Sequence, residues 1–281
     1  MLRHRAIILT GAGRGIGAAA SRLFGREGAK LVLNDLDAAE AEAIAADVRA
    51  AGGEAVAVGG SVTDSALPDK LVNAALEAYG GVDGIVNNAG FLWDGMLHKM
   101  DDKQWEAILD CHISAPFRLI RAAAPHMRDA AKAEIDKHGA AKDRAIVNVS
   151  STTGLHGAVG QANYAAAKAG VVGLTKTVAR EWGPLGVRCN AVAFGMIDTR
   201  MTNAFAEDGG GSVKIDGAEV PQGIPPHLAK MWSSGEFVRA MVPLARKGNA
   251  EEAASGMCFL ASPMASYVTG HTLEVTGGFG I

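Results

Sequence analysis

Short apolar runs alternate with longer stretches of helical periodicity along most of this 281-residue chain. The apolar runs predict strands at residues 6–10, 30–34, 55–58, 84–87, 145–149, 187–193 and 272–275. The stretches between them predict helices at residues 17–27, 38–51, 67–79, 114–137, 164–182 and 251–260. Strands that are apolar throughout are buried on both faces. The alternation therefore predicts an α/β protein with a doubly wound, seven-stranded parallel sheet and helices on both faces, in three αβα layers.

Two segments interrupt this alternation. Residues 128–144 form a charged, alanine-rich run that we expect to prolong a helix into solvent. Residues 200–242 include three consecutive glycines and a proline-rich stretch, and their periodicity is weak. About 40 residues without clear elements inside a compact domain are most often a functional lid or binding loop. We therefore expect a single domain over residues 1–281, with a lid at about 200–242.

Composition limits the compartment and the classes of partner. Hydrophobic residues make up 48% of the chain, enough to bury a large core, and a net charge of −3 provides no basic face for nucleic acid. The cysteines Cys111, Cys189 and Cys258 are far apart and odd in number, which is typical of free thiols in a reducing compartment. No run approaches the roughly 20 apolar residues of a membrane span, and the N-terminal residues do not form a signal peptide. The sequence thus predicts a cytoplasmic protein without a metal site, a membrane segment or a nucleic-acid partner.

A glycine-rich turn, Thr10-Gly11-Ala12-Gly13-Arg14-Gly15-Ile16-Gly17, follows the first predicted strand. Glycines let the backbone approach a dinucleotide pyrophosphate, and the N-terminus of the next helix offers unpaired N–H groups. Asp35 ends the second strand, where a carboxylate binds the adenosine ribose hydroxyls and repels a 2′-phosphate. These features predict a Rossmann-type fold that binds NAD, with NADP less favoured. Arg14 is either a partner for a 2′-phosphate or a solvated loop residue.

Further motifs resemble the short-chain dehydrogenase/reductase family over nearly the whole chain. Besides the glycine-rich turn, they are Asn87-Asn88-Ala89-Gly90, Ser151 after the fifth strand, and Tyr164-x-x-x-Lys168. The resemblance implies hydride transfer between nicotinamide and a carbonyl or secondary alcohol. It also implies cofactor contacts from Ser61, Val62, Asn88, Ala89, Gly90, Tyr164, Lys168, Gly195, Ile197 and Thr199. Two positions depart from the family pattern. The family often has aspartate where this chain has Ser61, and it usually has proline where this chain has Phe194, directly before Gly195.

Tyr164 and Lys168 lie four residues apart, so on a helix they share a face. Tyrosine acts as a base near pH 7 when its pKa falls by roughly three units, and we expect Lys168 and the oxidised nicotinamide ring to lower it. In the reductive direction Tyr164 is the acid. Ser151 is expected to bind the substrate oxygen, because alternation at the strand end directs the neighbouring Ser150 to the other side.

His112 is a departure from the family at a position that many members fill with asparagine. There the asparagine helps to hold a water that links the lysine to solvent. Imidazole also donates and accepts hydrogen bonds, and it titrates near neutral pH. The resemblance therefore implies that His112 takes over the relay, with a structural histidine as the alternative.

The substrate prediction is broader. His112, Asp35 and the run Gly160-Gln161-Ala162-Asn163-Tyr164 are similar to NAD-dependent 3-hydroxyacyl-CoA dehydrogenase domains, and the run is also similar to β-ketoacyl carrier-protein reductases. Both act on 3-oxo or 3-hydroxyacyl thioesters, which implies a hydrophobic small-molecule substrate. The apolar residues of the expected lid either cover an acyl chain or pack the lid onto the sheet; they are Met201, Phe205, Met231, Trp232 and Phe237.

Three functions follow from these observations. The first is an NAD-dependent oxidoreductase for a 3-oxo/3-hydroxyacyl thioester or another secondary alcohol, and the second is an NADP-dependent β-ketoacyl carrier-protein reductase. Asp35 distinguishes them. The third is a catalytically silent dinucleotide-binding sensor or scaffold, against which Ser151, Tyr164 and Lys168 argue. Members of the family are commonly dimers or tetramers, and the apolar tail at residues 275–281 is costly to leave in water, so we expect a homotetramer or homodimer.

Overall fold

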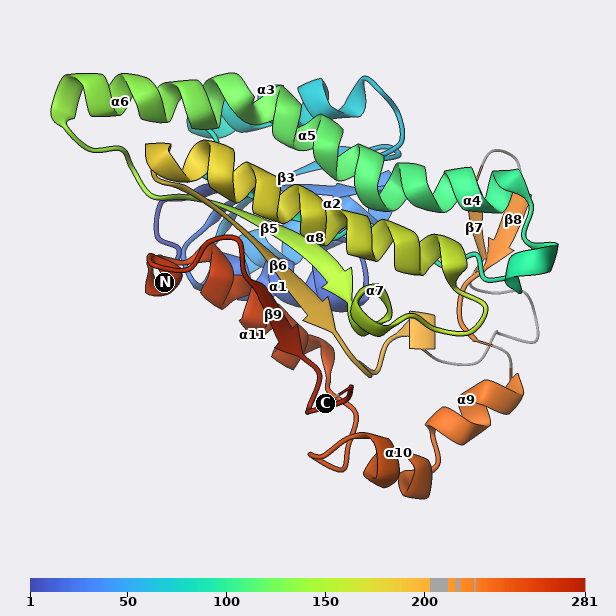
Figure 1. Cartoon of the computed structure of the whole chain (residues 1–281). Helices are drawn as coiled ribbons and strands as arrows, with labels where there is room; N and C mark the ends of the chain where they lie inside the picture. Colours follow the sequence, from blue (N-terminus) through green and yellow to red (C-terminus); the bar gives the residue numbers. More distant parts are fainter. Residues whose placement is uncertain (203–211, 216–217, 225, 281) are drawn as a thin grey trace.

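The computed structural model describes residues 1–202, 212–215, 218–224 and 226–280 (Figure 1). Within these residues, seven parallel strands form one sheet in the order β3-β2-β1-β4-β5-β6-β9. The strands are β1 (Ala6–Thr10), β2 (Lys30–Asp35), β3 (Glu54–Gly59), β4 (Gly84–Asn87), β5 (Arg144–Ser151), β6 (Val187–Phe194) and β9 (Thr272–Val275). The predicted doubly wound sheet is confirmed, and each strand lies within two residues of its predicted ends. The strand order reverses between β1 and β4, where ligands of such sheets bind at the carboxyl ends of the strands.

Helices cover both faces of the sheet (Figure 1). One face carries α1 (Gly15–Arg26), α2 (Ala38–Ala50) and α11 (Ala250–Ala261). The other carries α3 (Leu67–Tyr79), α5 (Ala115–Ala124) and α8 (Ala162–Trp182). Successive side chains of a strand point to opposite faces, so Ile7 and Leu9 of β1 pack with the first set of helices and Ile8 packs with the second. Each strand therefore has to be apolar on both sides, which is the pattern that the sequence shows.

The helix predicted at residues 114–137 is longer and less regular than expected. It comprises α4 (Asp102–Leu109), α5 and α6 (Ala130–His138), joined without a break by π-helical turns at Asp110–Ser114 and Pro125–Asp129. π turns are rare and frequently lie at functional sites. The first of them contains His112. This histidine is buried and lies against Phe91, in the loop after β4, and Tyr164.

The expected extension into solvent at residues 128–144 is correct only in part. The chain is helical as far as His138 and then returns to β5. At the start of β5 the buried Arg144 donates to both carboxylate oxygens of Glu134, at 2.7 and 2.9 Å. The backbone N–H of Lys142 also donates to Glu134, at 2.8 Å. Glu134 thus holds the helical extension against the start of β5.

The expected lid contains short elements of its own. A 3-10 turn at Arg200–Thr202 is followed, beyond an interval outside the described residues, by the antiparallel strands β7 (Ser212–Ile215) and β8 (Ala218–Pro221). Two short helices come next, α9 (Pro226–Trp232) and α10 (Gly235–Met241). Phe205 and the three glycines at 209–211 lie outside the described residues. Minor elements elsewhere are the 3-10 turns Leu97–Lys99, Gly183–Leu185 and Pro263–Ala265, and α7 (Thr152–His156).

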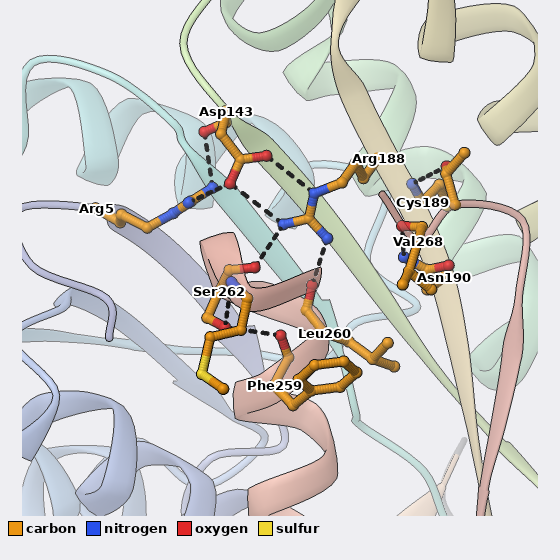
Figure 2. Close-up of polar contacts among 11 residues, drawn as sticks. Arg5, Asp143, Arg188, Cys189, Asn190, Phe259, Leu260, Ser262 and Val268 are labelled. Atoms are coloured by element: carbon orange, nitrogen blue, oxygen red, sulfur yellow. Dashed lines mark hydrogen bonds and ion pairs between the residues drawn. The ribbon is translucent and has the colours of Figure 1, made fainter. Parts of the chain in front are cut away.

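A cluster of charged residues joins distant parts of the chain at the amino ends of the strands (Figure 2). Asp143 accepts hydrogen bonds from Arg5 at 2.5 Å and from Arg188 at 2.9 Å. Arg188 also donates to the carbonyls of Leu260 and Ser262, at the C-terminus of α11. Carbonyls at a helix end lack partners within the helix, so Arg188 fastens α11 to the sheet. In the part of the chain that the structure describes, no helix is long and apolar enough to cross a membrane.

Candidate active site

The glycine-rich turn lies between the carboxyl end of β1 and the N-terminus of α1. Gly11 has a φ of +64°, and a Cβ built on Gly17 would lie 1.8 Å from the Gly11 carbonyl oxygen. Side chains are excluded from both positions, so the backbone alone forms the surface at the start of α1. The helix begins at Gly15, and its first N–H groups face this turn. These residues fit the pyrophosphate of a dinucleotide, as the sequence predicts.

The ribose end of the same site is acidic. Asp35 lies at the end of β2 and accepts a hydrogen bond from the Gly13 N–H at 2.9 Å. Arg14 pairs with Glu40 at 2.8 Å, and this hydrogen bond is the main cause of its raised pKa. Because Glu40 neutralises Arg14, the guanidinium is less available to a 2′-phosphate than a solvated arginine. The carboxylate side chains of Asp35 and Glu40 thus lie together beside Gly13, where the sequence predicts the adenosine ribose.

Asn88 connects the loop after β4 to the glycine-rich turn. Its side-chain amide donates to the carbonyls of Thr10 and Gly11, at 3.1 and 3.0 Å. The Thr10 hydroxyl accepts from the backbone N–H groups of Asn88 and Ala89. Only glycine fits at position 90, because a Cβ there would lie 2.4 Å from the His112 ring. The predicted cofactor residues of β1 and β4 therefore form one connected platform.

The remaining predicted cofactor residues surround this platform. Val62 lines a small apolar cavity with Thr10 and Ala89, next to Ser61, whose hydroxyl is bonded to Thr63 at 2.7 Å. After β6, Ile197 forms a parallel bridge with Gly248. Contact with Thr276 leaves no room for a side chain at Gly195, and Thr199 lies near Gly15. The structure therefore brings the segments after β1, β3, β4 and β6 to the same edge of the sheet.

Tyr164, Ser151 and Lys168 come together at the carboxyl end of β5. Ser151 and Tyr164 share a side-chain hydrogen bond. The Ser151 hydroxyl oxygen accepts from the Thr153 N–H at 3.1 Å, as the N-cap of α7. Lys168 is buried, and its Nζ lies 5.5 Å from the centre of the Tyr164 ring and donates to the Val149 carbonyl at 2.7 Å. Ser150 points elsewhere and donates to the Lys168 carbonyl.

The protein groups of this site keep Tyr164 protonated. Burial raises the pKa of Tyr164 to about 12, and the hydrogen bond with Ser151 offsets only part of that rise. Burial also lowers the pKa of Lys168 to about 8. The expected lowering of the Tyr164 pKa by Lys168 is therefore not what these residues produce by themselves. At neutral pH they hold a neutral phenol, which is the form that donates a proton.

His112 is packed against Tyr164. The two rings meet edge to face, with centres 5.1 Å apart. The His112 Nε2 lies 2.8 Å from the Phe91 carbonyl oxygen and 3.3 Å from the Phe91 backbone nitrogen. The shorter contact is with a group that can only accept, which assigns the proton to Nε2 and the lone pair to Nδ1. Nδ1 is buried without a hydrogen-bond partner among the described residues. Burial, followed by the charge of Lys168, holds the pKa of His112 well below its usual 6.5, so the ring is neutral.

Asp94 and Asn163 belong to the site although the sequence analysis gave them no role. Asp94 accepts from the Gln161 side chain at 2.9 Å and contributes to the raised pKa of Tyr164. The fully buried Asn163 donates to the carbonyls of Trp93 and Gln104, both at 3.0 Å, and so fixes the start of α8 beside the loop after β4. The available signal was the polar run Gln161-Ala162-Asn163 directly before Tyr164. No group of three or more His, Cys, Asp or Glu residues in the described ranges is arranged to hold a metal ion.

Comparisons with known proteins agree with this geometry. Residues 5–209 match the family described as short chain dehydrogenase, and residues 226–280 match the one described as enoyl-(acyl carrier protein) reductase. The chain is 35% identical over 279 residues to a 3-oxoacyl-(acyl-carrier-protein) reductase of Synechocystis sp., covering 99% of this chain and 97% of that protein. It is 35% identical over 277 residues to the reductase of the same name from Vibrio cholerae, covering 99% and 98%.

A solved structure matches the whole fold. It is described as a short-chain dehydrogenase/reductase SDR:glucose/ribitol dehydrogenase from Brucella melitensis. The TM-score is 0.79 at 28% sequence identity, and the match covers 100% of this chain and 98% of the other. Sequence and structure comparisons therefore agree on fold and on the class of chemistry.

Proposed function

The chain belongs to the short-chain dehydrogenase/reductase family of oxidoreductases, and from this premise we propose that it reduces 3-oxoacyl thioesters to 3-hydroxyacyl thioesters with a reduced nicotinamide dinucleotide. The observation that carries the proposal is the group of Ser151, Tyr164 and the buried Lys168 beside a backbone platform that fits a dinucleotide. The names of the curated relatives support the substrate class. They favour the carrier-protein reductase, which the sequence placed second, over the dehydrogenase.

The residues support the reductive direction. The glycine-rich turn and the loop after β4 would hold a reduced nicotinamide dinucleotide, which would supply the hydride for the carbonyl carbon of the substrate. Ser151 donates a hydrogen bond to the carbonyl oxygen, and Tyr164 transfers its proton to that oxygen as the C–O double bond becomes single. A Tyr164 pKa of about 12 keeps this proton available at neutral pH. The Lys168 ammonium then faces a phenolate, which its charge stabilises until a proton is returned from solvent.

The choice between NAD and NADP stays a prediction. The relatives' names support the carrier-protein reductase, for which the family resemblance implies NADP. Asp35, its bond to Gly13 and the pairing of Arg14 with Glu40 support NAD instead. A sensor or scaffold does not need this combination of side chains, so the intact Ser151, Tyr164 and Lys168 support an enzyme.

The test is an assay of purified protein with a 3-oxoacyl thioester and either NADH or NADPH, following nicotinamide absorbance. We expect turnover that Tyr164→Phe lowers at least about 100-fold, because the variant keeps the ring and loses the acid. Binding of the dinucleotide to this variant, measured by nicotinamide fluorescence, should be unchanged. No turnover of any 3-oxoacyl thioester by a protein that binds dinucleotide would reject the substrate class.

The same assay tests the cofactor. We expect wild-type protein to prefer NADH and Asp35→Ala to accept NADPH better than wild type does, because the variant removes a carboxylate next to the ribose. Exposed Asp37, two residues away, provides a matched control as Asp37→Ala. A wild-type preference for NADPH would overturn the role of Asp35 and leave the reductase proposal in place.

A further inference from the structure

The loop after β4 meets the loop between α7 and α8 next to the start of α8. Gly95 and Gln161 form an isolated parallel bridge, and the Gly95 N–H donates to the Gly160 carbonyl at 2.9 Å. Gln161 directly precedes α8, whose first turn carries Tyr164. The backbone thus brings the side chain of Asp94 next to the residue from which α8 begins.

Hydrogen bonds between side chains continue from this junction to Ser151. Asp94 accepts from the Gln161 Nε2 at 2.9 Å, and the Gln161 Oε1 accepts from the Thr153 hydroxyl at 3.2 Å. The Thr153 backbone N–H then donates to the Ser151 hydroxyl oxygen at 3.1 Å. The loop after β4, the start of α8 and the start of α7 are therefore connected by one series of hydrogen bonds, which ends at the serine expected to bind the substrate oxygen.

Asp94 determines which way the Gln161 amide faces. A primary amide has a donor end and an acceptor end, and a half-turn about its last bond exchanges them. A carboxylate only accepts, so Asp94 holds the donor end of Gln161 and leaves Oε1 toward the Thr153 hydroxyl. After the half-turn, Oε1 and the carboxylate would face each other as two acceptors. The carboxylate therefore selects the orientation in which the amide also binds Thr153.

The contact between Thr153 and Gln161 joins the beginnings of two helices. Ser151 is the N-cap of α7, and Gln161 is the N-cap of α8. Since Tyr164 lies in the first turn of α8, this contact also holds together the two helix starts whose hydroxyl groups share a hydrogen bond. A displacement of about 1 Å in such a group can change a rate about 100-fold. The orientation of one amide thus bears on the geometry of the reacting groups.

We propose that Asp94 is a positioning residue: it orients the Gln161 amide, which in turn holds the Ser151 hydroxyl in the place where it meets the substrate oxygen. This inference rests on the proposed function, and Asp94 supplies no proton to the reaction. Its effect therefore falls on kcat and leaves dinucleotide binding unchanged. The charge of Asp94 also contributes to the raised pKa of Tyr164, so the test has to change the amide while this charge stays.

Exchanging the donor and acceptor ends of the pair tests the orientation. Gln161→Glu keeps the Asp94 charge but leaves two carboxylates facing each other, and we expect kcat for a 3-oxoacyl thioester to fall about tenfold. Adding Asp94→Asn supplies a donor to the new carboxylate, whose second oxygen still accepts from Thr153. This double variant should recover kcat to within about threefold of wild type. In both variants the dissociation constant of the dinucleotide, measured by nicotinamide fluorescence, should stay within about twofold.

Two further variants complete the series. Asp94→Ala removes the acceptor for the amide, and we expect kcat to fall about fivefold. Asp102→Asn removes an exposed carboxylate at the start of α4 and should leave kcat within about twofold. A double variant as slow as Gln161→Glu alone, or a rise in KM with kcat unchanged, would contradict the positioning role.

Hydrogen exchange tests the junction without catalysis. In Gln161→Glu the amides of α7 should lose protection while those of the sheet strands keep theirs, and the added Asp94→Asn should restore it. Unchanged exchange in α7 would show that the amide does not hold the start of this helix. If wild-type protein turns over no 3-oxoacyl thioester, the proposed function fails, and the exchange result still decides whether Asp94 orients the junction.

Discussion

At the scale of single residues, the buried histidine in the first π turn is the most informative departure from the family. The resemblance leaves open whether His112 works in a proton relay or only fills space. Its geometry provides a neutral ring that meets Tyr164 edge to face, with Nε2 bound to Phe91 and a buried Nδ1 available as an acceptor. An acceptor in this position supports a hydrogen-bonding role, because a merely structural histidine gains nothing from an unpaired buried nitrogen.

Replacement of His112 separates the two roles. We expect His112→Leu to lower kcat about tenfold or more, and His112→Asn to retain most of the turnover, because the amide restores hydrogen bonding. Burial keeps the pKa of His112 well below 6.5, so the histidine does not titrate between pH 6 and 9. In either variant, an inflection of the pH–rate profile in this range should therefore shift by less than about 0.3 pH units. We expect Lys168, whose pKa burial lowers to about 8, to produce an inflection near that pH. Full turnover in His112→Leu would leave a structural role only.

The relative placement of the site residues could be predicted from the sequence where short-range geometry decides, while their roles stay predictions. The spacing of Tyr164 and Lys168 on one helix, and the alternation that separates Ser151 from Ser150, follow from backbone periods alone. The partners of Asp94 and Gln222 lie 67 and 130 residues away in the chain. No periodicity connects residues so far apart, and these contacts were accordingly not foreseen.

At the scale of elements, the same distinction separates the sheet from the additions around it. Strands buried on both faces leave continuous apolar runs, so all seven were predicted within two residues of their ends. The hairpin strands β7 and β8 mix polar and apolar residues, so no continuous apolar run marks them in the sequence. The π turns at Asp110–Ser114 and Pro125–Asp129 preserve an apparently ordinary helix pattern. Domain, lid and cofactor assignments that need such elements stay predictions.

The joint between α6 and β5 makes stability depend on pH. The hydrogen bond from Arg144 holds the pKa of Glu134 at about 2, below its ordinary 4.5. A carboxylate with a lowered pKa in the folded state stabilises the protein above its unfolded pKa, and this contribution is lost as the pH falls from about 4.5 through about 2. We expect Glu134→Gln to cost about 1 kcal/mol at neutral pH, a value reduced for solvent screening, and to flatten this part of the stability curve.

Denaturant unfolding between pH 7 and pH 3 measures this effect. Asp136→Asn, an exposed carboxylate on the same helix, controls for the change in net charge. Equal pH dependence of Glu134→Gln and wild type would show that the joint does not contribute.

At the scale of the whole molecule, two kinds of surface bear on assembly. Phe117 and Trp105 are 45% and 38% exposed on the helices before β5, where a second copy could cover them. The apolar C-terminal tail is a weaker argument for assembly than the sequence suggests, since Phe279 packs within its own chain against Met196, Val238 and Val242. The homotetramer thus stays a prediction that light scattering can test, and it makes measured stability depend on protein concentration.

The charged cluster of Figure 2 gives the last prediction, because it separates stability from catalysis. Burial alone raises the pKa of Asp143, but hydrogen bonds from Arg188 and Arg5 outweigh burial and hold it below its usual value. Asp143→Ala leaves both buried guanidinium groups without their carboxylate, and we expect the free energy of unfolding to fall by about 2–3 kcal/mol. This value is smaller than for a fully buried ion pair because 30% of the Asp143 side chain is exposed. Asp47→Ala breaks an exposed pair with Arg22 and should cost less than about 1 kcal/mol. The cluster lies at the amino ends of the strands and the active site at their carboxyl ends, so kcat of Asp143→Ala at low temperature should equal that of wild type; a fall in kcat would mean that the two edges of the sheet are coupled.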